Sequence, residues 1–194
     1  MNAAKSENVA FSNRPYVHTH LIFDENIIPR VFKARYLGLI MDSKLRWSHH
    51  IETKLKQINL KISKMYWLFN KKFKLKLRNK VLLYKTMIRP IWAYGCQLWA
   101  CAAKTNVLKI VTCQNKCLRM IAGAKWYSRN SDTRQELGIE SVEEFISKVY
   151  ERYEDRLHLH PNSEAVKLLD SDGVRRLRRR KPHELISKYF LKVS

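Results

Sequence analysis

Apolar residues occur in short β-like groups along the first part of the chain. Residues 8 to 12 and 19 to 23 are strand candidates, and residues 24 to 26 are typical of a turn. The apolar segment 31 to 41 predicts a further strand, although Gly38 lies inside it. Glycine inside a strand indicates either a bulge or a position that another backbone approaches closely. Both interpretations of Gly38 are open from this pattern alone.

From Trp47 the apolar period becomes helical. Asp42 or Ser43 is placed to cap the turn before this predicted helix, and lysines occupy its other faces. A lysine face is either plainly solvated or directed at an anionic partner. Steps of three or four residues, as in a helix, separate the apolar positions of this segment, which are Trp47, Ile51, Leu55, Ile58, Ile62, Met65 and Phe69.

A second helical pattern runs from Leu77 to Ile91. Pro90 should kink or interrupt it, because proline lacks the backbone N–H that the helix needs. Beyond Pro90 the chain is apolar on nearly all sides, which predicts a buried helix.

Two further helices carry recognisable end signals. Residues 105 to 122 form a helical pattern that ends at Gly123, a C-terminal cap signal. The sequence SVEE, with Ser141 and Glu144 at its ends, is a capping box that begins an amphipathic helix. Pro161 ends that helix.

The order of elements predicts an α+β chain that is mostly α. We expect a β-rich part over residues 1–44, a helical bundle over 45–170 and a basic tail over 171–194. The tail contains the run RRLRRRK at 175 to 181, which is open to three interpretations: a solvated tail, a phosphate-binding segment or a nuclear import signal.

The charge changes the expected partner. Lys and Arg number 38 against 17 Asp and Glu, a net charge of +21, which favours a polyanion or an anionic membrane surface. Nucleic acid is favoured, because the basic residues are spread along the chain among five Trp and nine Tyr. No secretory signal opens the chain, and the apolar run from Ile91 to Ala103 is too short to span a bilayer. We therefore expect a soluble intracellular protein and no membrane partner.

The chain offers no convincing catalytic or metal site. The spacing of Cys96, Cys101, Cys113 and Cys117 fits no common zinc site, and we expect buried thiols. No two aspartates are paired inside an apolar strand, as a two-metal polymerase or nuclease would require. The remaining metal-like fragments, at 49–52, 158–160 and 170–173, are incomplete, so we predict no catalytic residue, no metal ligand and no cofactor in this chain.

Six segments in order resemble the reverse transcriptase of jockey-like non-long-terminal-repeat retrotransposons, over nearly the whole chain. They are NAAKSENVAFS, ARYLGLIMDSKLRWSHHI, LLYKTMIRPIWAYGCQLW, QNKCLRMIAGAKWYSRN, LGIESVEEF and HPNSEAVKLL. The resemblance implies that residues 1–44 are the edge of a palm-like domain and residues 45–170 a thumb-like domain. It also implies that the catalytic aspartates of the polymerase, and the Mg²⁺ that they hold, lie outside these residues.

The resemblance assigns roles to single positions. Lys5 matches a lysine close to the incoming nucleotide, although Ser6 follows where the family usually has Thr. Tyr36, Leu37 and Gly38 match the primer-grip turn, which implies a close backbone approach at Gly38. With the lysines and arginines that would meet phosphate, the expected nucleic-acid contacts are Lys5, Tyr36, Leu37, Gly38, Lys54, Lys61, Lys64, Lys71, Lys72, Lys74, Arg175, Arg176, Arg178, Arg179, Arg180 and Lys181.

Three functions are compatible with these observations. The first is the carboxyl-terminal palm edge and thumb of an RNA-directed DNA polymerase, which grips the template–primer duplex, binds no small-molecule substrate and is inactive alone. We expect it in a nuclear and/or cytoplasmic ribonucleoprotein. The second is a non-enzymatic basic nucleic-acid-binding protein derived from a mobile element. The third, a membrane-surface protein, is disfavoured because the apolar helix faces are needed to pack against each other.

Overall fold

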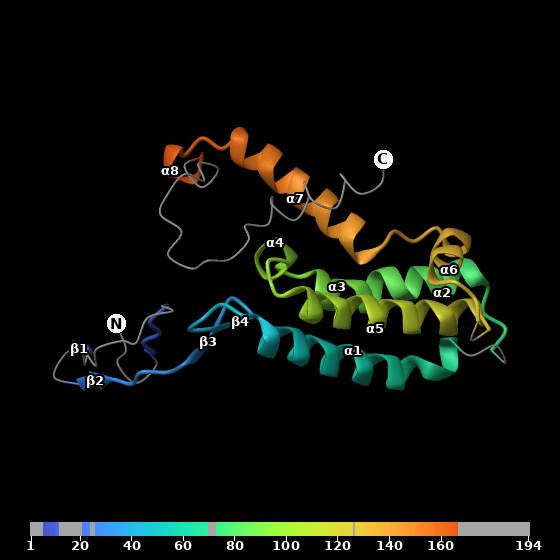
Figure 1. Ribbon diagram of the computed structural model, residues 1–194, viewed down its shortest axis with the longest axis horizontal. Coiled ribbons are helices and arrows are strands. Elements are labelled where there is room, and N and C mark those ends of the chain that lie inside the picture. Colours follow the sequence, from blue (N-terminus) through green and yellow to red (C-terminus); the bar gives the residue numbers. More distant parts are fainter. Residues whose placement is uncertain (1–5, 12–20, 24–25, 70–72, 126, 167–194) are drawn as a thin grey trace.

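The chain folds as two β-hairpins followed by a set of helices, so it is α+β and mostly α, as predicted (Figure 1). The computed structural model describes residues 6–11, 21–23, 26–69, 73–125 and 127–166. The first hairpin pairs β1 (Leu21–Phe23) with β2 (Asn26–Ile28), which confirms part of the strand predicted over 19 to 23. Residues 8 to 11 form no strand; a single bridge joins Asn8 to Arg30.

The segment from 31 to 41 is a second hairpin rather than one strand. Its arms are β3 (Lys33–Tyr36) and β4 (Leu39–Asp42), and Tyr36 pairs with Leu39. Leu37 and Gly38 remain as a two-residue turn with φ values of 46° and 75°. Positive φ at both central residues is what the type I′ hairpin turn requires. The prediction of a single strand is therefore wrong, and of the two interpretations of Gly38 the bulge is excluded.

Asp42 joins this hairpin to the first long helix, α1 (Ser48–Phe69). Its carboxylate accepts hydrogen bonds of 2.9 to 3.1 Å from the backbone N–H groups of Lys44, Arg46 and Trp47. The loop can thus hold Trp47 at a φ of 61°, with its side chain buried beside the hairpin. The predicted helix is confirmed, and of the two residues placed to cap the turn before it, Asp42 does so.

The next helical segment is continuous but changes its winding. It consists of α2 (Leu77–Leu83), a π-helical turn η2 (Tyr84–Ile88) and α3 (Arg89–Ala93). The π turn comes just before Pro90, where the ring of proline clashes with the carbonyl one turn earlier and the regular ladder cannot continue. The predicted interruption at Pro90 is therefore confirmed.

The predicted buried helix beyond Pro90 is wrong. The helix ends at Ala93, and Gly95, with φ of 64°, starts the short helix α4 (Cys96–Trp99). Trp92 and Trp99 are buried, but Tyr94 and Leu98 are each about half exposed. The sequence pattern misses this break because it depends on one glycine in a left-handed conformation.

Four helices complete the described chain: α5 (Lys104–Ala122), α6 (Asn130–Leu137), α7 (Val142–His158) and α8 (Ser163–Val166). Gly123 ends α5 with φ of 61°, which confirms the cap. The capping box before α7 is also confirmed, since the side chain of each partner bonds the other's backbone N–H. The sequence pattern did not predict α6 or α8.

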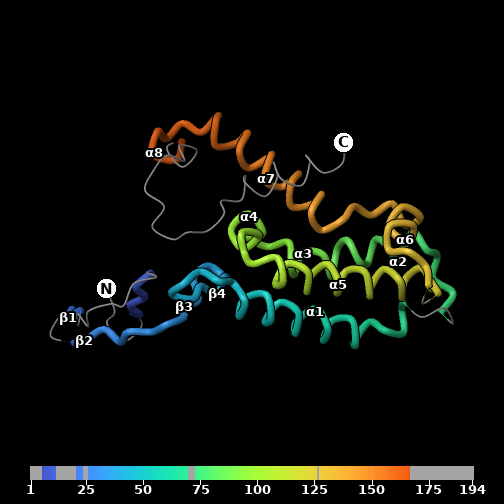
Figure 2. The backbone as a smooth tube through the Cα atoms, in the orientation of Figure 1, coloured from blue at the N-terminus to red at the C-terminus, as the bar shows by residue number. Residues whose placement is uncertain are grey.

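The helices pack around one core. α1 lies along α5 and also contacts η2 and α3, while α7 crosses over α4 and touches α5 (Figures 1 and 2). Lys80 on α2 is buried and donates from Nζ to the carbonyl oxygen of Phe69 at 3.2 Å, which supplies a positive charge at the end of α1. The largest fully buried side chains include Trp99, Tyr84, Phe69, Ile51, Ile58, Ile88, Ile110 and Leu118.

A polar network ties η2, α3, α5 and α7 together. The Tyr84 hydroxyl donates to Gln114 Oε1 at 3.0 Å, and Gln114 Nε2 donates to the Glu140 carbonyl oxygen at 2.8 Å. The Glu140 carboxylate accepts from Arg89 at 2.8 Å and from Lys148 at 3.1 Å. Burial raises the pKa of the Tyr84 hydroxyl well above its ordinary value, so it stays a donor. The network fixes the π turn, α5 and α7 relative to one another.

Gly95 gives a test of how closely the α3–α4 turn packs on the second hairpin. A Cβ at Gly95 would lie 2.6 Å from Leu39 Cδ2, whereas a Cβ at Gly138 would meet nothing within 4 Å. Both glycines have positive φ, so alanine at either costs about 1 kcal/mol in backbone strain. We expect Gly95→Ala to lose at least about 1 kcal/mol more than Gly138→Ala in urea unfolding, because of the overlap with Leu39. Equal losses would contradict this packing.

Candidate nucleic-acid interface

The tip of the second hairpin rests on the helical body through Tyr94. The Tyr94 hydroxyl donates to the Leu37 carbonyl oxygen at 2.6 Å. A Cβ on Gly38 would lie 3.4 Å from the Tyr94 ring, an ordinary van der Waals contact, so the glycine is favoured by its positive φ rather than by a lack of space. Glycine at this position thus has a sufficient structural reason. Its close approach to nucleic acid stays a prediction.

Aromatic, apolar and basic groups surround the tip. Tyr36 and Leu37 are 63% and 69% exposed. Behind them the Lys54 ammonium lies 5.4 Å from the centre of the Tyr94 ring. Burial lowers the pKa of Lys54, and the charge of Arg35 lowers it further, which indicates that the two cations lie near each other. The tip therefore combines groups that contact sugar and base with groups that attract phosphate.

The predicted lysines of α1 form one flank. Lys54, Lys61 and Lys64 are separated by seven and three residues, which places them on the same side of the helix. Lys54 and Lys61 are half-buried and Lys64 is exposed; Lys74 is exposed beyond the helix end. We call Lys54, Lys61 and Lys64 the lysine flank. The structure thus brings the predicted turn and the first of these lysines together and continues the basic surface along α1.

The other predicted contacts lie outside the described residues. They are Lys5, Lys71, Lys72, Arg175, Arg176, Arg178, Arg179, Arg180 and Lys181.

His50 supports the hairpin from the first turn of α1. It is fully buried, and its Nδ1 accepts the backbone N–H of Ile40 on β4 at 3.2 Å. Burial, with a smaller contribution from the charge of Lys54, lowers the pKa of His50 to about 4. The imidazole is therefore neutral near pH 7 and acts as an acceptor. The sequence fragment at 49–52 did not indicate this role.

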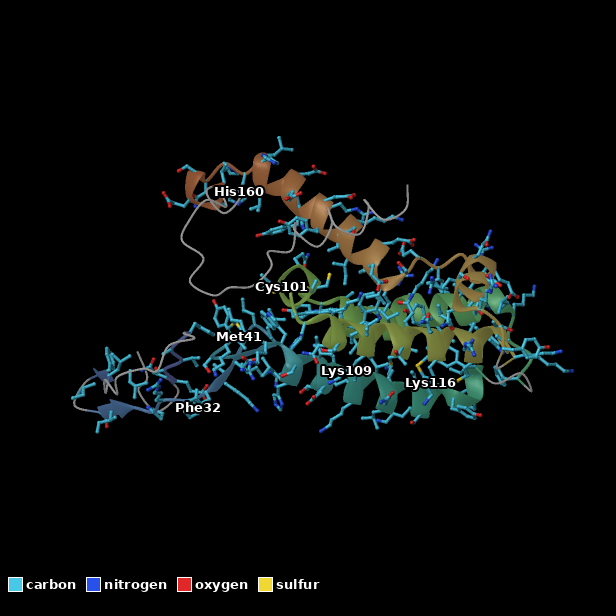
Figure 3. All side chains as sticks on the ribbon, viewed as in Figure 1. Phe32, Met41, Cys101, Lys109, Lys116 and His160 are labelled. Atoms are coloured by element: carbon cyan, nitrogen blue, oxygen red, sulfur yellow. The ribbon has the colours of Figure 1, made fainter. Side chains whose placement is uncertain are left out.

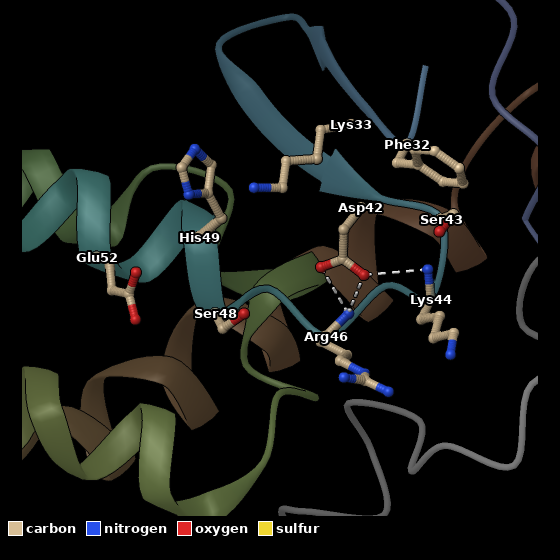
Figure 4. A pocket seen from close by; sticks show the side chains of 9 residues that line it. All are labelled: Phe32, Lys33, Asp42, Ser43, Lys44, Arg46, Ser48, His49 and Glu52. Atoms are coloured by element: carbon tan, nitrogen blue, oxygen red, sulfur yellow. Dashed lines mark hydrogen bonds between the residues drawn. The ribbon is translucent and has the colours of Figure 1, made fainter. Parts of the chain in front are cut away.

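An open pocket lies between the second hairpin and the start of α1 (Figure 4). Backbone N–H groups of the loop engage both oxygens of Asp42, while the side chains of Lys44 and Arg46 point away from that carboxylate. The pocket therefore adds to the basic surface at this end of α1. Its lining residues are Phe32, Lys33, Asp42, Ser43, Lys44, Arg46, Ser48, His49 and Glu52.

One signal in the sequence could have located this basic surface. No aspartate or glutamate lies between Glu52 and Asp132, a stretch that includes most of α1 and all of α2 to α5. Glu52 itself is bridged at 3.4 Å by Lys109 of α5, which Figure 3 labels. Most of α1 and all of α2 to α5 thus contribute cations and no carboxylate of their own to the surface. Arg35 and Tyr94 were also missed, because their proximity to the tip depends on the tertiary fold.

None of the four cysteines, all of which lie in the described residues, forms a disulfide, and two of them, Cys96 and Cys117, are buried. Burial raises the pKa of Cys96 to about 11 and that of Cys117 to about 12, so both are protonated near neutral pH. Cys113 and Cys117 lie on the apolar side of α5, as predicted, although Cys113 is only partly buried. Within the described ranges, no three His, Cys, Asp or Glu side chains are grouped to hold a metal ion. The described helices include none long and apolar enough to span a membrane.

Comparison with known proteins identifies the relatives of this chain. It is 36% identical over 188 residues to the probable RNA-directed DNA polymerase from transposon X-element of Drosophila melanogaster, covering 97% of this chain and 21% of that protein. It is 35% identical over 194 residues to the RNA-directed DNA polymerase from mobile element jockey of the same species, covering 95% and 21%. A third relative, the probable RNA-directed DNA polymerase from transposon BS, is 34% identical and covers 79% and 17%.

The chain is therefore a homologue of one segment of the RNA-directed DNA polymerases of mobile elements. Within that class its relatives are the polymerases of jockey-like non-long-terminal-repeat retrotransposons. This confirms the resemblance found in the sequence. The chain spans about a fifth of the length of the first relatives it matches. No protein-family model matches the chain, and no solved structure matches it.

Proposed function

We propose that this chain is the thumb-like part of a retrotransposon RNA-directed DNA polymerase and that it grips the template–primer duplex. The observation that carries the proposal is the placement of the Leu37–Gly38 turn on Tyr94, with Lys54 beside it at the start of the lysine flank. The relatives named as RNA-directed DNA polymerases support the same role. On this proposal the tip holds the primer end, and the lysine flank contacts phosphates.

The proposal extends to catalysis, to Mg²⁺ and to the place of the protein in the cell. We propose that the chain binds the duplex without extending it: among the residues that the structure describes, the aspartate beside the site is Asp42, and its carboxylate is engaged by the loop before α1. Mg²⁺ would then belong to the complete polymerase. We also propose that the protein works inside the cell, in a nuclear and/or cytoplasmic ribonucleoprotein.

Charge reversal of the lysine flank tests the duplex contact. The variant Lys54→Glu/Lys61→Glu/Lys64→Glu should bind an RNA–DNA primer–template at least about ten-fold more weakly, because repulsion replaces contacts to phosphate. The slope of log affinity against log salt should fall by about two to three, since roughly one counterion is released per phosphate contact. Fluorescence anisotropy with labelled duplex over a range of salt concentrations measures both quantities.

A second triple variant controls for net charge. Lys85, Lys104 and Arg152 are exposed and lie on η2, α5 and α7 rather than on α1. Their replacement by glutamate changes the net charge by the same amount and should weaken binding much less. Equal losses in the two variants would show that only the overall charge attracts the duplex and would remove the assigned interface.

A further inference from the structure

Large apolar side chains are exposed at the far end of α1. Leu60 is 59% exposed, Tyr66 54% and Trp67 57%, and Phe73, just past the helix, is 41% exposed. Leu60 and Trp67 are seven residues apart and share the side of the helix that faces away from the buried Ile58. Exposed apolar side chains gathered in this way usually mark a surface that binds a partner.

The indole of Trp67 is held in place while it remains accessible. The rings of Trp67 and Phe73 meet nearly at right angles, with their centres 5.0 Å apart. Such edge-to-face pairs are favourable, so Phe73 restricts the orientation of the indole. A rigid ring loses little conformational freedom when a planar partner stacks on it.

The charges around these rings indicate the class of partner. Lys56 and Lys64 on α1 and Lys74 beyond it are exposed, and the chain has no acidic residue from Thr53 to Ser131. Aromatic rings set among cations are the groups on which single-stranded nucleic acids stack their bases. An apolar protein partner would fit the rings but would gain nothing from so uniform a positive charge.

We propose that Trp67 and Phe73 form a stacking platform for the unpaired bases of a nucleic-acid strand, whose phosphates meet Lys74. Trp67 lies about 20 Å from Lys54 along the helix axis, at a rise of about 1.5 Å per residue, so the platform is separate from the hairpin tip. This inference rests on the proposed function in one respect: the strand extends from the duplex that the lysine flank holds.

Two substrates distinguish binding by the platform from binding by the lysine flank. One is a blunt RNA–DNA duplex, and the other is the same duplex with a single-stranded extension of about ten thymidines. The wild-type chain should bind the extended substrate about ten-fold more tightly than the blunt one. Trp67→Leu should abolish this preference and leave binding to the blunt duplex unchanged, whereas Trp67→Phe should keep most of it. Thermal melts should differ by no more than a few degrees among the three proteins, because Trp67 is largely exposed and Trp67→Leu removes only its ring contact with Phe73.

The outcomes distinguish this inference from its alternatives. Equal binding of the two substrates by the wild type, or an unchanged preference in Trp67→Leu, would overturn the platform. Loss of self-association in Trp67→Leu, with no change in binding, would assign the surface to a second copy of the chain instead. If reversing the lysine flank leaves duplex binding intact while Trp67→Leu loses the preference, the proposed function fails and the platform stands.

Discussion

Phe69→Ala should lower the free energy of unfolding by about 3 to 5 kcal/mol, the range found when a fully buried phenylalanine is truncated. Phe69 is completely buried at the end of α1, and its carbonyl oxygen is bonded by the buried Lys80. Its removal leaves a cavity where α1 ends against α2. A domain of this size has only about 5 to 15 kcal/mol of stability in total, so the variant should be partly unfolded in mild urea.

Urea unfolding followed by far-ultraviolet circular dichroism measures this loss. Leu60→Ala is the matched control, because Leu60 lies on the same helix and is 59% exposed. We expect it to change stability by no more than about 0.5 kcal/mol. A similar loss in both variants would mean that the last turn of α1 is not packed as described.

His50 should make the stability of the fold depend on pH below neutrality. Its pKa is about 4 in the folded chain, against the ordinary value of 6.5 expected when unfolded. Between these values the unfolded chain binds more protons, so stability falls as the pH is lowered. The contribution of neutral His50 is complete above pH 6.5 and is lost progressively toward pH 4, by up to about 3 kcal/mol.

Two asparagine variants isolate this contribution. His50→Asn keeps an acceptor for the Ile40 N–H but cannot be protonated, so the stability of the variant should vary less between pH 7 and pH 5 than that of the wild type. His49→Asn is the control, because the neighbouring His49 is exposed. Its pH dependence should match the wild type. The same pH dependence in wild type and His50→Asn would rule out His50 as the titrating group.

The long helices were predictable because their signals are local. The apolar steps of α1, the glycine after α5 and the capping box before α7 each depend on residues within a few turns of one another. Helix α6 was missed because its eight residues bury only two side chains, Thr133 and Leu137, and so show no apolar stripe.

The hairpin tip shows why the turn and its contact with the helices could not be predicted from the sequence. Leucine is not a residue that favours positive φ, so Leu37 gives no local indication of a turn. The conformation is supported by a hydrogen bond from Tyr94, 57 positions away in the chain. The lysine flank followed from helical spacing, but its association with the tip depends on that long-range contact. A single sequence does not report which distant side chains meet.

The hairpin is attached to the helices at both of its ends, and this has a mechanical consequence. At its base, Asp42 locks the loop that leads into α1; at its tip, Tyr94 bonds Leu37 from the end of α3. Contacts at both ends restrict rotation of the hairpin about its base and about its tip. A displacement of the tip relative to the helices would first have to break the Tyr94–Leu37 hydrogen bond, so this contact keeps the turn beside the end of α3 and close to Lys54 of the lysine flank.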